Sequence, residues 1–160
     1  MFKINKKKTL NIILFLSIFT LLVAFFIQYI LGHKPCNLCI IERIPYILAI
    51  VLISFNLMFN IYQKIIFFLL GVIFIAAAAI SFYHFGIEQG FFDESLVCDL
   101  NPNFEDISRE ELLKSLKLET ISCKDVTFKV LGLSLATINT ILSLILSAIN
   151  IKIFLNYEKN

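Results

Sequence analysis

Two cysteines separated by two residues, Cys36 and Cys39, carry the clearest chemical signal in this chain. At this C-x-x-C spacing one thiolate can attack a bond that the other sulfur holds, and nearby positive charge or a helix N-terminus lowers the pKa of such thiols. Lys34 and Arg43 flank the pair, and an apolar segment expected to be helical begins just after it. We therefore expect the pair to be redox-active.

The other two cysteines, Cys98 and Cys123, lie far apart in a polar segment. An even number of cysteines in an oxidising compartment favours two disulfides, and four cysteines allow three pairings. Pairing within the C-x-x-C motif leaves Cys98 with Cys123. A bond inside that motif encloses few residues and so stabilises a fold little, which favours redox chemistry over a purely structural role.

Metal and haem binding are weaker interpretations of these cysteines. Structural zinc sites usually present two closely spaced pairs of ligands, and this sequence has one such pair. Covalent haem attachment needs a histidine directly after the second cysteine of the motif, where this chain has Ile40. We therefore expect no resident metal.

The segments that must position the cysteines are strongly apolar. The 160 residues are 59% hydrophobic and 16% charged, which is unusual for a soluble domain. The uncharged runs are long enough to cross about 30 Å of hydrocarbon as helices. The sequence predicts an all-α integral membrane protein, a single domain over 1–160 built as an antiparallel bundle of four transmembrane helices. The expected spans are 10–31, 44–63, 65–83 and 130–151.

The distribution of charge predicts the orientation of these spans. Both termini and the turn at Gln63 and Lys64 share one side, which carries seven lysines and one acid, as is typical of a cytoplasmic face. The outer loops 32–43 and 84–129 hold all four cysteines, and the second loop has a net charge of −5. The total charge of the chain, +2, gives no reason to expect a nucleic-acid partner.

Three smaller expectations follow from the same pattern. Ser108 and Glu111 form a capping box, which predicts a short amphipathic helix near 109–118 that lies against the membrane surface. The first run is too long, and lacks the cleavage site, for a signal peptide to be the better interpretation. Because the chain has no tryptophan, the tyrosines are expected to lie at the membrane interfaces: Tyr29, Tyr46, Tyr62 and Tyr83.

The segment Cys36-Asn37-Leu38-Cys39-Ile40-Ile41-Glu42-Arg43-Ile44-Pro45, just before the second span, resembles the signature of the disulfide bond formation protein B (DsbB) family. The resemblance extends over the four spans, the short first outer loop and the long second loop with its two cysteines. It implies a membrane enzyme that reoxidises a periplasmic thioredoxin-like thiol oxidase of the DsbA type. Electrons would pass to ubiquinone or menaquinone, the relay that keeps the bacterial periplasm oxidising.

The resemblance also implies roles for individual residues. Cys98 would meet the partner first, and Cys123 would then attack Cys36. Cys39 would be the thiolate that contacts the quinone ring. Arg43 would polarise the quinone, and His84, expected at the outer end of the third span, would donate a hydrogen bond or relay a proton.

We therefore expect a bacterial inner-membrane thiol:quinone oxidoreductase with cytoplasmic termini and periplasmic cysteine loops. A vitamin K epoxide reductase-like enzyme is the nearest catalytic alternative, but in that family the C-x-x-C motif comes late in the chain. A non-catalytic membrane scaffold with disulfide-stapled loops is the alternative from a different functional class. Such structural disulfides should resist reduction by glutathione.

Overall fold

The computed structural model describes residues 5–59, 63–93, 123–124, 129–130 and 132–157. Within these ranges the chain contains four helical segments long and apolar enough to cross a membrane. This confirms the predicted all-α four-helix membrane protein. The elements in chain order are α1 (Lys6–Tyr29), α2 (Asn37–Ile41), α3 (Ile44–Phe59), α4 (Gln63–Glu88), β1 (Lys129–Val130), β2 (Leu133–Ser134) and α6 (Leu135–Leu155).

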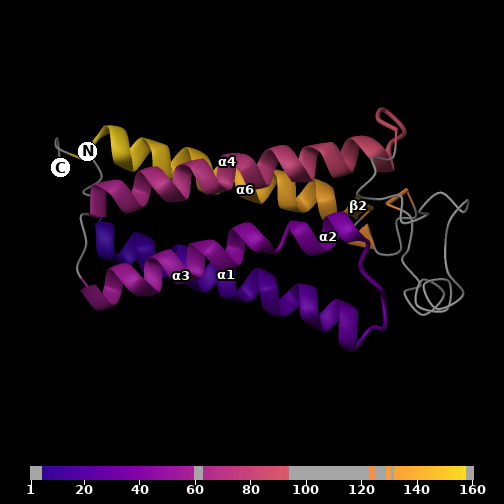
Figure 1. Ribbon diagram of the computed structural model, residues 1–160, viewed down its shortest axis with the longest axis horizontal. Helices are drawn as coiled ribbons and strands as arrows, with labels where there is room; N and C mark the ends of the chain where they lie inside the picture. Colours follow the sequence, from indigo (N-terminus) through magenta and orange to yellow (C-terminus); the bar gives the residue numbers. More distant parts are fainter. Residues whose placement is uncertain (1–4, 60–62, 94–122, 125–128, 131, 158–160) are drawn as a thin grey trace, which may run out of the picture.

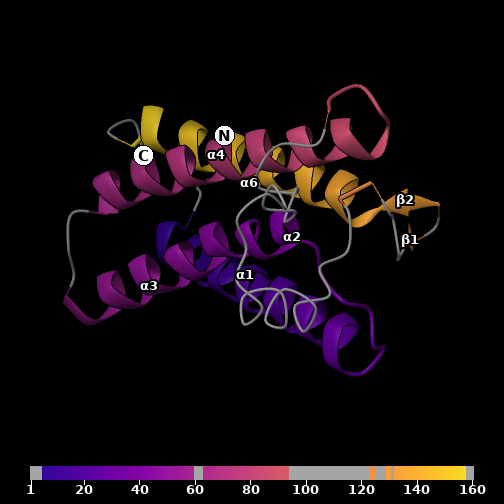
Figure 2. The ribbon, with the colours of Figure 1, turned by 45° about the vertical axis from the view of Figure 1, so that its right-hand side comes forward.

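The long helices run alternately up and down the bundle (Figure 1). The start of α1 and the end of α6 lie at one end, and α2, the end of α4 and the start of α6 lie at the other. Helix α1 packs on α3, and both α3 and α6 pack on α4. In the turned view of Figure 2, β1 and β2 extend beyond the same end of the bundle as α2. The cysteine motif and the segment that leads into α6 therefore share one end.

The outward faces of the helices are apolar, as a bilayer requires. Large hydrophobic side chains are exposed along the helices, among them Phe15 at 68%, Leu22 at 61% and Met58 at 77%. Several small polar side chains are buried instead, including Ser17, Asn56 and Asn150. An apolar exterior around a partly polar interior is what distinguishes a membrane bundle from a soluble one.

The observed helix limits differ from the uncharged runs used to predict them. Helix α4 begins at Gln63, which was expected to end the preceding span, and continues past Tyr83 to Glu88. It stops where Gly90, at φ +76, allows the N–H of Phe91 to bond the carbonyl of Gly86, a glycine-based helix termination. His84 therefore lies within the helix rather than beyond its end.

The second span begins at Ile44, as the sequence predicts, whereas the fourth begins later than predicted. Helix α2 occupies part of the first outer loop, and the chain turns at Glu42 and Arg43 before α3 starts at Ile44. Pro45 thus lies in the first turn of α3, where its missing N–H costs no helical hydrogen bond. Helix α6 starts at Leu135 rather than residue 130, because β1 and β2 pair first and the Ser134 side chain then accepts from the N–H of Thr137.

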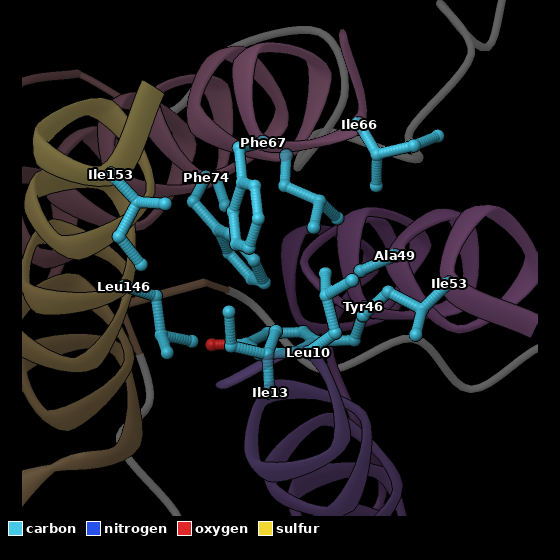
Figure 3. Close-up of a cluster of buried hydrophobic side chains, with 12 residues drawn as sticks. Leu10, Ile13, Tyr46, Ala49, Ile53, Ile66, Phe67, Phe74, Leu146 and Ile153 are labelled. Carbon is cyan, nitrogen blue, oxygen red and sulfur yellow. The ribbon is translucent and has the colours of Figure 1, made fainter. Parts of the chain in front are cut away.

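The hydrophobic core lies in the half of the bundle away from the cysteine motif. Figure 3 shows side chains from all four long helices meeting there, including Leu10, Ile53, Phe67 and Leu146. Close approach of α4 and α6 depends on Gly71, because a Cβ at that position would lie 3.0 Å from the Ile151 side chain. Small residues at such contacts let membrane helices pack tightly.

Three predictions fall on residues outside the described ranges. These are the amphipathic helix near 109–118, the position of Cys98 and the interface position of Tyr62.

Candidate active site

The C-x-x-C motif lies at the N-terminus of α2. Cys36 is the N-cap residue, and its sulfur accepts a hydrogen bond from the N–H of Cys39 at 3.3 Å. The two thiols are free, with their sulfur atoms 2.8 Å apart. The hydrogen bond with Cys39 lowers the pKa of Cys36 to about 5; burial opposes this effect, and the neighbouring His84 adds to it. In the reduced pair, these contacts therefore favour a thiolate at Cys36.

His84 of α4 connects Cys36 to a buried carboxylate. Its Nε2 atom lies 3.5 Å from the Cys36 sulfur, and its Nδ1 atom lies 2.7 Å from Oε1 of Glu42. The imidazole is 3% exposed and Glu42 is 8% exposed. A thiol, an imidazole and an orienting carboxylate in this order form a nucleophile, a base and a group that fixes the base.

Glu42 is held in turn by a polar network that joins three helices. Asn139 of α6 donates through Nδ2 to Oε2 of Glu42 at 2.8 Å and to the hydroxyl of Ser81 at 2.7 Å. The Tyr46 hydroxyl donates to the Asn139 carbonyl oxygen and lies 3.2 Å from the hydroxyl of Ser143. Tyr46 is only 2% exposed, so its expected place at the membrane interface is wrong.

Cys123 lies against the C-x-x-C motif although 83 residues stand between it and Cys39 in the sequence. It is 3% exposed and belongs to the same buried cluster as Cys36, Leu38 and Ile87. Cys123 is disulfide-bonded. Because Cys98 is outside the described residues, its pairing with Cys123 stays a prediction.

A cavity of about 410 Å³ opens beside the two free thiols. That volume lies within the range of small-molecule sites, which are mostly apolar with a few placed polar groups. Helices α1 and α6 contribute most of the apolar wall, with Phe19 and Leu142 among the residues. The polar and sulfur-bearing residues that line the cavity are Thr20, Gln28, His33, Lys34, Cys36, Cys39, Glu42, Arg43, Tyr46, His84, Glu88, Cys123 and Asn139.

Arg43 lines this cavity from the turn between α2 and α3. Its guanidinium donates to Oε1 of Gln28 at 2.6 Å, and its central carbon lies 5.0 Å from the centre of the Phe25 ring. These contacts with α1 hold a planar cation at the cavity wall while leaving further N–H donors on the fork. Cys39 and Arg43 share the cavity even though the helix is interrupted between them.

The donor atoms of Cys36, Cys39 and His84 lie within 4.8 Å of one another, which would suit a thiophilic metal ion. A closed structural zinc site needs a fourth ligand, and the Glu88 carboxylate lies 3.8 Å from Nε2 of His84. The sulfurs and the imidazole are already engaged with one another in hydrogen bonds. The arrangement thus suits thiol chemistry without requiring a metal.

The structure brings together five of the six residues singled out from the sequence: Cys36, Cys39, Arg43, His84 and Cys123 line one cavity. Glu42 and Asn139 also belong to the site, although the sequence pattern alone predicted no role for either residue. Both had a detectable signal, since each is a polar side chain next to or within an apolar span, and such residues in membranes usually serve function.

Comparison with known proteins agrees with this arrangement. The family described as "Disulfide bond formation protein DsbB" matches residues 6–153, which include the whole described site. The "Uncharacterized protein RP370" of Rickettsia prowazekii (strain Madrid E) is 28% identical over 147 residues, covering 90% of this chain and 86% of the relative. No solved structure matches significantly. With two free thiols beside a cavity in a four-span bundle and a family match over nearly its full length, this chain belongs to the disulfide bond formation protein DsbB family.

Proposed function

We propose that this membrane protein is a thiol:quinone oxidoreductase that reoxidises a periplasmic dithiol oxidase of the DsbA type. The observation that carries the proposal is the free Cys36 and Cys39 pair in the wall of a largely apolar cavity. A quinone ring is a small apolar molecule with polar oxygen atoms. The cavity offers it an apolar wall from α1 and α6 and a fixed cation at Arg43.

Electrons enter through the second cysteine pair. A thiolate of the partner attacks the disulfide at Cys98, releasing Cys123 as a thiolate, and the second partner thiol then displaces Cys98. The partner gains a disulfide, and this protein gains the reduced pair of Cys98 and Cys123. Two electrons and two protons have moved in the exchange.

The reduced second pair then passes its electrons to the first. Cys123 attacks Cys36 of the oxidised C-x-x-C pair, Cys39 leaves as a thiolate, and Cys98 attacks Cys123 to release Cys36. The burial of Cys36 and Cys123 in one cluster supports this exchange. The lowered pKa of Cys36 also supports it, because a thiol of low pKa leaves a disulfide faster.

The last step returns the Cys36 and Cys39 pair to the disulfide. A bound ubiquinone or menaquinone would supply the acceptor for two electrons and two protons. Arg43 would hold a quinone oxygen through its free N–H donors, and a fixed cation stabilises negative charge that develops there. His84 takes the proton that Cys36 releases, with Glu42 fixing the imidazole.

The proposed setting is the bacterial inner membrane, with the cysteine-bearing end of the bundle facing the periplasm. The lysines near the other end favour a cytoplasmic location for it, because positive charge is retained on that side. The proposed partners are thus a periplasmic dithiol oxidase and the quinone pool of the lipid.

A trapping experiment tests the order of the cysteines. A partner oxidase that lacks the second cysteine of its active site cannot resolve the mixed disulfide, so it should accumulate covalently on Cys98. The expected result is a gel band that dithiothreitol removes and that Cys98→Ser abolishes. Mapping of the partner to Cys36 in the otherwise unchanged protein would contradict the proposed relay.

A further inference from the structure

Glu42 is a buried carboxylate, with 8% exposure, inside a largely apolar bundle. Buried carboxylates are costly unless hydrogen bonds satisfy both oxygens. His84 contacts one oxygen, Oε1, at 2.7 Å. The other oxygen, Oε2, receives its hydrogen bond from the Asn139 side chain at 2.8 Å.

The orientation of the Asn139 amide is fixed by its other contacts. Its carbonyl oxygen accepts from the Tyr46 hydroxyl, and its NH₂ group also donates to the hydroxyl of Ser81. A flipped amide would place its carbonyl oxygen against Oε2 of Glu42, so that two acceptors would face each other. Helices α3 and α4 thus hold the α6 asparagine with its donor directed at the carboxylate.

We propose that Asn139 is a positioning residue that holds Glu42 so that His84 stays against Cys36. The inference rests on the proposed function, because it concerns how the thiol pair of that same site is held and charged. The described contacts form one continuous path from Asn139 through Glu42 and His84 to the Cys36 sulfur, with each step at 3.5 Å or less.

These contacts predict in which direction the loss of Asn139 changes the pKa of Cys36. Glu42 would lose a donor and hold the imidazolium less firmly, so the thiolate of Cys36 would lose part of its stabilising cation. The pKa of Cys36 should therefore rise. The other titratable or charged groups that line the cavity and stay unchanged are His33, Lys34, Cys39, Arg43, Tyr46 and Glu88.

The test measures thiolate formation directly, without partner or quinone. The full-length protein is purified, reduced and alkylated with iodoacetamide across a pH series, and modification of Cys36 is quantified by fragment mass spectrometry. In the unchanged protein the thiolate should persist until the pH falls toward 5. Asn139→Leu, which keeps the approximate side-chain shape, should move the midpoint upward by about one pH unit, the loss expected for a hydrogen bond to a charged group.

Two comparisons separate positioning from a general structural effect. In a His84→Ala background, Asn139→Leu should cause no further shift, because the path to Cys36 is already broken. Asn150→Leu is the matched control. Asn150 is a buried asparagine of the same helix, and its side chain donates to the carbonyl of Leu146 in its own helix. Its carbonyl oxygen has no hydrogen-bond partner among the residues that the structure describes. This control should leave the midpoint unchanged.

The proposal is overturned by an unchanged midpoint in Asn139→Leu, by an equal shift in the His84→Ala background, or by the same shift in Asn150→Leu. If Asn139→Leu does not fold, Tyr46→Phe removes the donor that fixes the amide and should shift the midpoint in the same direction; no shift there also overturns it. A normal shift in a protein that cannot reduce quinone would instead reject only the proposed function.

Discussion

Arg43 illustrates how contacts with a neighbouring helix hold a single side chain at the cavity wall. Its hydrogen bond to Gln28 and its position over the Phe25 ring tie the turn after α2 to α1. The Phe25 ring covers part of one face of the guanidinium group. The remaining N–H groups of the guanidinium can still donate to a ligand in the cavity. The cation is thus held beside the thiols rather than extended toward the membrane surface.

Replacement of Arg43 tests that role in the proposed reaction. Arg43→Ala should raise the quinone concentration required for half-maximal turnover by about tenfold or more, the size expected for losing a hydrogen bond to a charged group. The quinone concentration that Arg43→Lys requires should lie between those of the unchanged protein and Arg43→Ala, because lysine keeps the charge but loses the planar guanidinium. Turnover is followed by quinol formation at a series of quinone concentrations.

Partner exchange provides the control for these variants. The rate at which the partner forms its mixed disulfide with Cys98 should be unchanged, since that step does not use the quinone cavity. An unchanged requirement for quinone in Arg43→Ala would mean that Arg43 only anchors the turn to α1.

The sequence was sufficient to single out residues that share one cavity, but not the residues that hold them in place. The spacing of the cysteines and the adjacent arginine can be read directly from the sequence. In the structure, five of the six predicted residues line one cavity. Tyr46 and Asn139 become partners only because α3 and α6 meet, although 92 residues stand between them in the sequence. Their pairing depends on helix rotation, which an apolar run does not specify.

Among the helices, the contact between α4 and α6 sets the geometry of the site. His84 and Ser81 come from α4 and Asn139 from α6, so their hydrogen bonds need the two helices at a fixed separation. Nearer the other end, Gly71 allows that closeness, and the Ser147 hydroxyl donates to its carbonyl oxygen at 3.3 Å. Packing far from the cysteines is therefore coupled to their surroundings.

A larger side chain at position 71 tests this coupling. Gly71→Leu should clash with Ile151 and destabilise the protein by about 1–3 kcal/mol, the usual cost of overpacking. The expected measurement is a lower unfolding temperature in detergent, accompanied by slower quinone reduction.

Val72→Leu is the control for Gly71→Leu, because Val72 is on the same helix and 48% exposed toward lipid. It should leave both the unfolding temperature and the rate close to those of the unchanged protein. Equal behaviour of the two variants would contradict a close helix contact at Gly71.

Helix existence could be predicted from the sequence, whereas helix limits could not. An uncharged run ends at the first charged or polar residue, but a helix continues until its backbone is capped. Helix α4 therefore passes through His84 to Glu88, and the Gly90 termination follows. Helix α6 starts later than predicted for the same reason, because the N-cap at Ser134, and not hydropathy, determines where the helix begins.

For the whole molecule, the number of spans and the common end of the three described cysteines followed from composition and parity. The chain is a multi-pass membrane protein of the DsbB family. Its proposed orientation rests on the positive-inside rule, since lysines concentrate near the start of α1 and the end of α6.

Labelling of single introduced cysteines tests this orientation. In a background with the four native cysteines changed to serine, Asp93→Cys should react with a membrane-impermeant maleimide in intact spheroplasts. Lys7→Cys should react only after lysis. Both positions are exposed at opposite ends of the bundle, so the reverse pattern would contradict the proposed topology.

Electron transfer from the Cys36 and Cys39 dithiol to quinone is tested most directly by anaerobic mixing of the purified, reduced protein with oxidised quinone. The expected result is stoichiometric quinol, with Cys36 and Cys39 becoming inaccessible to alkylation. A Cys98→Ser, Cys123→Ser protein should still perform this half-reaction, and Cys39→Ser should not. Quinone that remains oxidised beside free Cys36 and Cys39 thiols, or equal reduction by Cys39→Ser, would contradict the proposed function.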